Sequence, residues 1–453
     1  MLFALVSAAG ALAQAAGEPS FAVIPPGPVA RGVRLELRLA VQNSTDTEML
    51  ARVAFFLDAE SSDSMIGEQT VAVPAREKGL TRVWYTANAP AGTHEIRYKL
   101  KTPSGECTGT WPVEIVDWTT RALPYLQGMW IEPIAVLLGA ADTKPETLRL
   151  AIKDSVAAMD RLGVRILIIA YVEYFGQFFY PSGIEFFDAD VQRTSKGGDC
   201  GFDMVGAFLS EADMHGMHVF LGLARSGDSP LLWEFDEPDW DLRNAKALDV
   251  AKNVARELWQ KYGAHRSFYG WYLTHEMNDL ARASAYYDPL ARYCHGLVPE
   301  KPVMVGPAGT PVITPELLAS SAVDIFAYQD AVGAGYVPYK YTYRPERRIA
   351  MLDDIYGKYA AWHANAGKHF WSDLEIWEMD GSQGYGGSYP APFARVKRQI
   401  DIECRHAEML TGYAYHGFLQ PPGSVAEKPV AQAQELYTDY LEYLRSLRFR
   451  GGR

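Results

Sequence analysis

Residues 268–279 have the sequence FYGWYLTHEMND, an apolar and aromatic run that ends in a cluster of polar side chains. The first six residues have the character of a strand buried on both faces. A helical pattern follows in SAYYDPLARYCHGL (284–297). A buried strand that leads into a helix is the repeating unit of a parallel sheet. The polar cluster therefore marks the point where such a strand reaches the surface.

The same succession of strand, loop and amphipathic helix repeats along the chain after residue 120. Several predicted helices end in glycine, at 163, 216, 263 and 367, as a connection from helix to strand favours. Eight strands that alternate with helices over about 330 residues are typical of a (β/α)₈ TIM barrel. The predicted strands are LQGMWIEP (126–133), VRILIIAYV (164–172), MHVFLGLA (217–224), FYGWYLTHE (268–276), PVMVGPA (302–308), VDIFAYQD (323–330), HFWSDLEIWE (369–378) and GYAYHGFL (412–419).

An open dinucleotide-binding sheet is the competing α/β architecture. Such a sheet carries a glycine-rich phosphate loop after its first strand. The sequence contains neither GxGxxG nor GxxxxGK[ST]. The barrel is therefore the favoured fold for the larger part of the chain.

The first hundred residues have a different pattern, in which apolar residues alternate within short runs separated by turn residues. Period-two runs at this spacing are typical of an antiparallel β-sandwich of the immunoglobulin or fibronectin kind. The runs lie at 33–43, 51–59, 68–75, 81–88, 94–102 and 111–118. We predict a sandwich domain at 18–118, which positions the barrel, helps to bind polysaccharide or serves as a spacer, and a barrel domain at 119–453.

The N-terminal segment, MLFALVSAAGALAQAAG (1–17), is apolar and has small residues at Ala13 and Ala15. These are features of a secretory signal peptide, although no Lys or Arg precedes Arg31. The apolar run is too short to span a bilayer. The sequence favours an exported protein, either secreted or periplasmic.

The composition is that of a globular protein, with 48% hydrophobic and 22% charged residues. A formal net charge of −12 disfavours a nucleic-acid partner, because such proteins need clustered Lys and Arg. The four cysteines form no CxxC pair, so they indicate neither a zinc site nor a disulfide framework. The first predicted strand also lacks the HxH pair of a metal-dependent barrel. We expect no metal and no cofactor.

Polar and aromatic residues gather at the ends of the predicted strands, where a TIM barrel places its active site. Carboxyl groups next to aromatic rings suit a sugar, because rings stack on its CH faces and carboxylates bind its hydroxyls. The candidate substrate-binding residues are Trp130, Glu132, Tyr171, Glu173, Arg225, His275, Asn278, Tyr328, Gln329, Asp330, Asp373, Trp377 and His416. The expected partner is a carbohydrate.

Hydrolysis of a glycosidic bond needs two carboxyl groups, one that protonates the leaving oxygen and one that attacks the anomeric carbon or activates water. Glu276 and Glu375 are the best pair in the sequence. They end the fourth and seventh predicted strands, which lie on opposite sides of a barrel mouth. The sequence therefore predicts a glycosidase that acts on an oligo- or polysaccharide.

The motifs GWYLTHEMND (270–279) and FAYQDAVGAG (326–335) resemble a bacterial family of TIM-barrel glycosidases of unknown function. The positions of Glu276 and Glu375 resemble the clan of retaining (β/α)₈ glycoside hydrolases. The resemblance covers residues 125–444. It implies that Glu276 is the acid/base, that Glu375 is the nucleophile and that Tyr328 bonds to this nucleophile.

The chain departs from the clan at two positions. It has His275 where the clan has Asn before the acid/base, and His416 and Phe418 lie where the clan has a Trp at the end of strand eight. These differences affect the contact to the sugar 2-hydroxyl and the floor of the sugar site.

Several structural alternatives stay open at the level of sequence. Glu276 is either catalytic or an acidic residue at the start of the next helix. Asp330 either binds sugar or forms an Asx turn before the glycines. Glu375 and Glu378 lie on opposite faces of a strand, so a shift of register would exchange them. Glu173 and Arg225 either contact substrate or form a salt bridge.

Two other functions also remain open. A carbohydrate-binding barrel would use the same carboxylates without turnover. A polysaccharide lyase would use Tyr171, His275 or His416 as a base.

Overall fold

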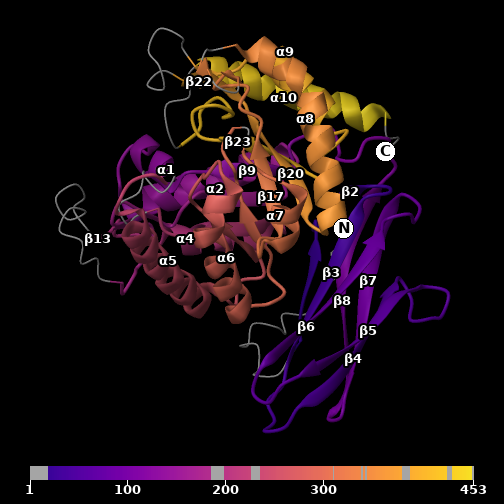
Figure 1. The fold of residues 1–453 in the computed structure, drawn as a ribbon. Helices are drawn as coiled ribbons and strands as arrows, with labels where there is room; N and C mark the ends of the chain where they lie inside the picture. The colour runs from indigo at the N-terminus through magenta and orange to yellow at the C-terminus, as the bar shows by residue number, and fades with distance from the viewer. Residues whose placement is uncertain are drawn as a thin grey trace.

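The computed structural model describes residues 19–184, 198–225, 235–309, 311–337, 340–341, 344–379, 388–425 and 431–450. An all-β part is followed by a barrel that helices surround (Figure 1). The predicted signal peptide at 1–17 lies outside the described residues.

Eight parallel strands close into a barrel surrounded by helices, as the sequence predicts. Each strand is short and almost entirely buried, as a strand covered on both faces must be. The eighth strand was predicted at 412–419 but ends at Tyr413, so the residues after it belong to a loop. In order around the barrel, the strands are β9 (Gly128–Ile131), β10 (Ile166–Ile169), β14 (His218–Gly222), β15 (Phe268–Leu273), β16 (Val303–Val305), β17 (Ile325–Gln329), β20 (His369–Glu375) and β23 (Leu410–Tyr413).

The helices pack their apolar faces on the outside of the barrel. Gly216 and Gly367 follow two of them in the left-handed conformation that the sequence indicates, whereas Gly263 is right-handed. The described helices are α1 (Pro133–Gly139), α2 (Pro145–Arg161), α4 (Met204–His215), α5 (Trp240–Tyr262), α6 (Leu280–Leu297), α7 (Pro315–Ser320), α8 (Pro345–Ala366), α9 (Phe393–Glu403) and α10 (Ala431–Arg450).

Short strand pairs lie in the loops that follow the barrel strands. They are β11 (Glu173–Tyr174) with β12 (Gln177–Phe178) and β13 (Gly198–Asp199), β18 (Tyr336–Val337) with β19 (Lys340–Tyr341), and β21 (Trp377–Met379) with β22 (Ser388–Pro390).

The all-β part consists of two sheets, with strand orders β1-β3-β6 and β2-β8-β7-β4-β5. Alternate residues of the strands, such as Leu35, Leu37 and Val53, are fully buried in a core of their own. The sequence prediction missed β1 and β2. The strands are β1 (Ser20–Ile24), β2 (Val29–Ala30), β3 (Arg34–Gln42), β4 (Met49–Leu57), β5 (Met65–Val73), β6 (Lys78–Thr86), β7 (Gly92–Thr102) and β8 (Gly105–Val116).

The sandwich packs against the end of the barrel at which the strands begin (Figure 1). The hydroxyl of Tyr269, near the start of β15, donates to the carbonyl of Val23 at 2.6 Å. The ring of Trp111 stacks on His218, the first residue of β14, with 5.4 Å between ring centroids. This contact leaves the opposite end of the barrel, where the strands finish, to the loops.

A buried network of charges joins the two parts. Arg38 on β3 donates to Glu36 at 2.8 Å and to Asp324, just before β17, at 2.5 Å. His369, the first residue of β20, bonds to Glu36 at 3.2 Å and to Glu408 at 2.7 Å. Removing either kind of partner from such a network leaves a buried charge uncompensated, which is costly. The network therefore fixes how the sandwich sits on the barrel.

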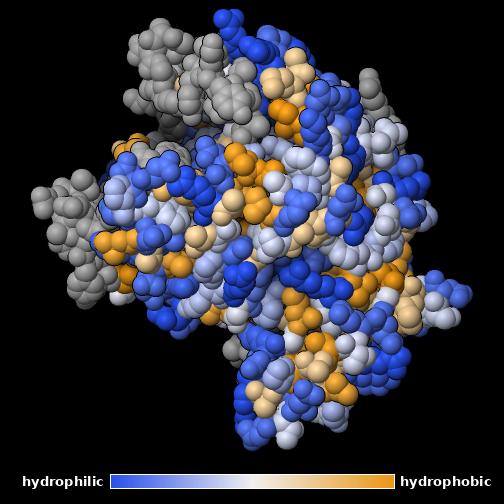
Figure 2. Space-filling view, in the orientation of Figure 1, coloured by the Kyte–Doolittle hydropathy of each residue, from blue (hydrophilic) through white to orange (hydrophobic). Residues whose placement is uncertain are grey.

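The surface seen in Figure 2 carries small groups of hydrophobic residues among hydrophilic ones. Such dispersed groups are ordinary on a folded domain. None of the helices within the described ranges combines the length and the apolar character that crossing a bilayer requires.

The stability of the protein should fall as the pH rises through the titration of His369. Burial alone would lower the pKa of His369, but Glu408 and Glu36 outweigh it and raise the pKa to about 9. The protonated ring therefore contributes fully below pH 6.5, and roughly 3 kcal/mol of unfolding free energy is lost by pH 9. Urea unfolding of the wild type and of His369→Gln between pH 6 and 9.5 measures this loss.

The variant should lose most of this pH dependence. His406→Gln, which removes a histidine paired with Asp353 near the surface, is the matched control and should keep it. An equal slope in the wild type and in His369→Gln would contradict the role of this histidine.

Candidate active site

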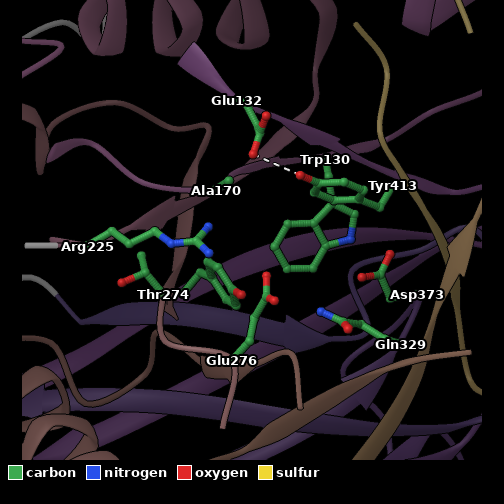
Figure 3. Close-up of a pocket in the computed structure, with 10 residues that line it drawn as sticks. Trp130, Glu132, Ala170, Arg225, Thr274, Glu276, Gln329, Asp373 and Tyr413 are labelled. Atoms are coloured by element: carbon green, nitrogen blue, oxygen red, sulfur yellow. Dashed lines mark hydrogen bonds between the residues drawn. The ribbon is translucent and has the colours of Figure 1, made fainter. Parts of the chain in front are cut away.

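A polar pocket lies at the end of the barrel where the strands finish (Figure 3). Seven of the eight strands contribute to it, either with their last residues or with the loop that follows. Most of its side chains are charged, hydroxylated or aromatic. The lining residues are Trp130, Glu132, Ala170, Arg225, Tyr272, Thr274, Glu276, Gln329, Asp373 and Tyr413.

Glu276 reaches the pocket from a link between β15 and α6. The N-cap of α6 is Asp279, whose side chain accepts from the backbone N–H of Arg282 at 3.3 Å. Glu276 therefore precedes the helix, and the alternative of an acidic residue at the helix start is wrong. Thr274 fixes the beginning of the link, since its hydroxyl donates to the carbonyl of Ala224 at 2.6 Å.

Arg225 supplies positive charge to the pocket. Burial opposes its charged form, but Glu276 and Glu132 are among the neighbours that raise its pKa. Tyr413 donates a hydrogen bond to Glu132 at 2.8 Å, which Figure 3 shows as a dashed line. Burial raises the pKa of Glu132, and Tyr413 and Arg225 offset part of this rise. The guanidinium thus lies among more carboxyl groups than it can neutralise.

Asp373 is the carboxyl group that β20 places in the pocket. Its side chain is almost fully buried, and its Oδ1 has no hydrogen-bond partner among the described residues. Burial raises its pKa well above the ordinary value, and Asp330, Glu375 and Glu276 raise it further. Burial and these neighbouring carboxyl groups therefore disfavour the charged form of Asp373.

Glu375 lies next to the pocket and does not line it. Its Oε2 accepts a hydrogen bond at 2.8 Å from the backbone N–H of Ala334, in the loop that follows β17. A Cβ at Gly333 would overlap the carbonyl oxygen of Trp377, so the loop approaches this closely only with glycine there. Burial and then Asp330 raise the pKa of Glu375 to about 8. Glu378 points elsewhere, toward Arg395 at 3.4 Å.

Asp330 organises the loop that covers Glu375. Its Oδ1 accepts from the backbone N–H of Val332 at 3.0 Å, which is an Asx turn, and from that of Glu375 at 3.2 Å. Its Oδ2 accepts from Gln399 on α9. The Asx-turn alternative is therefore correct, and Asp330 is absent from the pocket lining.

Three predicted site residues face the surrounding helices. The hydroxyl of Tyr328 bonds to His363 on α8 at 3.0 Å, so its predicted contact with the nucleophile is wrong. His275 packs edge-on against Tyr286 on α6, and His416 bonds to Ser155 on α2 at 3.2 Å. Burial lowers the pKa of both histidines to about 3, with Arg225 adding to the effect at His275. Neither histidine lines the pocket, and a role in substrate contact or as a base stays a prediction.

The remaining predicted residues surround the pocket without lining it. Tyr171 stacks on Tyr174 with 4.8 Å between ring centroids. The carbonyl of Glu173 accepts from the backbone N–H of Arg225 at 3.0 Å, and its carboxylate accepts from the backbone of Gly176. Asn278 is exposed, and Trp377 is partly buried on β21. Substrate contact by these residues stays a prediction.

Tyr413, Tyr272, Thr274 and Ala170 line the pocket but were not predicted as site residues. The signal for Tyr413 was present, since it stands in the run predicted as strand eight. The predicted strand, 412–419, begins two residues later and ends six residues later than β23, so the prediction placed His416 rather than Tyr413 near the strand end. In the described ranges, no three His, Cys, Asp or Glu side chains are grouped as a metal site would require.

Comparisons with known proteins agree with the barrel fold. Residues 128–426 match the family described as Domain of unknown function (DUF4434). No curated protein sequence matches the chain. A solved structure of a candidate α-L-fucosidase from Bacteroides thetaiotaomicron has a TM-score of 0.51 and 18% identity, over 71% of this chain and 93% of that protein.

Two further solved structures are more distant. A GH2 β-galacturonidase from Eisenbergiella tayi bound to galacturonate has a TM-score of 0.42 and 13% identity, over 91% of this chain and 69% of that one. A β-glucuronidase from Bacteroides uniformis has a TM-score of 0.38 and 12% identity, over 88% and 45%. At these identities a likeness establishes only a similar fold, and it says nothing about which residues act.

Replacing Arg225 with Gln should destabilise the protein in a pH-dependent way. The variant removes the positive charge beside Glu276 and Glu132, and a partly buried carboxylate that loses its nearby cation should cost roughly 1–3 kcal/mol. The loss should be present at pH 7.5 and smaller at pH 5, because burial raises the pKa of Glu132 and this carboxyl group takes up a proton more readily as the pH falls. Urea unfolding at both pH values measures it. Arg225→Lys keeps the charge and is the control. An equal loss at both pH values would mean that packing, rather than charge, is responsible.

Proposed function

The chain belongs to the family described as Domain of unknown function (DUF4434), and from that premise we propose that it is a glycoside hydrolase. The observation that carries the proposal is that Glu276 from β15 and Asp373 from β20 line one pocket at the mouth of the barrel. Trp130, Tyr272 and Tyr413 provide rings and hydroxyls beside these carboxyl groups. Carboxyl groups and aromatic side chains together suit a sugar.

The two carboxyl groups divide the chemistry between them. Glu276 takes the acid/base role that the resemblance implies, and Asp373 is the second carboxyl group, which attacks the anomeric carbon or activates water. A sugar whose hydroxyls donate hydrogen bonds to Asp373 favours the ionised form of Asp373, which is the form that attacks or activates water.

The assignment of Asp373 differs from the role of nucleophile that the resemblance gives to Glu375. The difference rests on position, because Asp373 lines the pocket, whereas the carboxylate of Glu375 is bonded to Ala334. In our proposal Glu375 does not contact the sugar, and it affects the reaction by raising the pKa of Asp373.

We also propose that the sandwich is an immunoglobulin-like module that supports the barrel. It covers the end where the strands begin, so the described part of this module lies away from the pocket. Its role is then to hold the barrel, and polysaccharide binding by the module would be a separate property.

Glu276→Gln should abolish hydrolysis. General acid catalysis contributes about 10²- to 10⁴-fold, so kcat/KM should fall by that factor on any oligosaccharide that the wild type cleaves. A panel of polysaccharides and oligosaccharides, followed by release of reducing ends, provides the measurement. Asp279→Asn removes a carboxylate three residues away but keeps an N-cap side chain, and it should retain activity. Sugar binding by a wild type that cleaves nothing on the panel would favour the binding barrel.

Asp373→Asn and Glu375→Gln distinguish the two assignments for β20. We expect Asp373→Asn to lose about 10³-fold or more in kcat, because it removes the second carboxyl group. Glu375→Gln should lose far less, since the amide oxygen still accepts from Ala334. Both variants need circular dichroism to show that they are folded. The reverse order of losses would restore the role of nucleophile to Glu375.

A further inference from the structure

The link between β15 and α6 carries Glu276 and has no regular secondary structure of its own. β15 ends at Leu273 and α6 begins at Leu280. Buried backbone groups in such a link need hydrogen-bond partners from elsewhere. His275 and Met277, on either side of Glu276, are both buried.

The Met277 N–H donates to the His275 carbonyl within the link at 3.1 Å, and Tyr287, on the second turn of α6, supplies a further partner to both groups. Its side chain is almost completely buried, and its hydroxyl donates to the carbonyl of His275 at 2.5 Å. The same hydroxyl accepts from the backbone N–H of Met277 at 3.0 Å. One oxygen atom thus holds the peptide groups on both sides of Glu276.

The ends of the link are fixed by other contacts. Thr274 donates to the carbonyl of Ala224 on the side of β14, and Val312 donates to the carbonyl of Asn278 at 2.7 Å. Tyr287 acts between these two points, at the place where the backbone turns Glu276 toward the pocket.

We propose that Tyr287 is a positioning residue that sets the orientation of Glu276 through the backbone, an inference that rests on the proposed role of Glu276. A general acid works only within hydrogen-bond reach of the leaving oxygen. A displacement of about 1 Å costs up to 100-fold in rate. A hydroxyl that holds both neighbouring peptides limits such displacement without touching the substrate.

The neighbouring residue, Tyr286, provides a matched control. It is fully buried on the same helix and packs against the ring of His275. Its hydroxyl has no hydrogen-bond partner among the described residues. Tyr286→Phe and Tyr287→Phe therefore remove the same atom from adjacent buried positions, and only the second breaks the two bonds beside Glu276.

The first test compares two leaving groups. An unactivated oligosaccharide needs a proton from the acid, whereas a dinitrophenyl glycoside of the same sugar does not. Tyr287→Phe should lower kcat/KM about 10- to 100-fold on the oligosaccharide and about twofold or less on the dinitrophenyl glycoside. Tyr286→Phe should change neither value. Equal losses on both substrates, or no loss, would overturn the positioning role.

The second test needs no enzymatic activity. Amide hydrogen exchange of peptides that cover 274–280 should become about tenfold faster in Tyr287→Phe, because the Met277 amide loses one of its two acceptors and keeps only the His275 carbonyl at 3.1 Å. Tyr286→Phe should exchange like the wild type. Unchanged exchange in Tyr287→Phe would overturn the inference. A wild type that cleaves no glycoside but shows the expected exchange would instead overturn the proposed function and leave the backbone contact established.

Discussion

The parallel order of the eight barrel strands is the constraint on which the site depends. Parallel strands in a closed sheet all finish at the same end, so side chains hundreds of residues apart in sequence meet there. Trp130 on β9 and Tyr413 on β23 lie beside each other because these two strands close the barrel. The pocket is therefore a property of the whole barrel and not of any one motif.

The two ends of the barrel differ in how far their buried charged groups are paired. At the end covered by the sandwich, Arg38 and His369 have carboxylates on both sides, and the pKa of Glu36 is lowered to about 2. At the pocket end, the guanidinium of Arg225 faces an excess of carboxyl groups, and the pKa of Asp373 is raised. Paired charges suit a permanent contact between domains. Unpaired carboxyl groups with perturbed pKa values are typical of sites that bind or react.

The sequence predicted the barrel, its eight strands and most of the charged residues of the pocket, because apolar runs and strand ends are local features. The prediction was wrong where it depended on which face of a strand a side chain occupies. Tyr328 and Gln329 are adjacent, yet only Gln329 reaches the pocket, since neighbouring side chains point to opposite faces. His275 lies beyond the end of β15, where the alternation of a strand no longer applies, and His416 was predicted at the end of a strand that stops earlier than its apolar pattern.

The position of Glu375 could not be predicted, because it depends on contacts between distant segments. Asp330 binds the backbone of Glu375 and the side chain of Gln399, and the loop after β17 folds over the end of β20 as a result. Asp373 lines the pocket, whereas Asp330 and Glu375 do not, yet both raise the pKa of Asp373. The pKa of Asp373 thus depends partly on carboxyl groups that do not line the pocket. Residues that line the pocket therefore do not alone determine its charge, because Asp330 and Glu375 affect the pKa of Asp373.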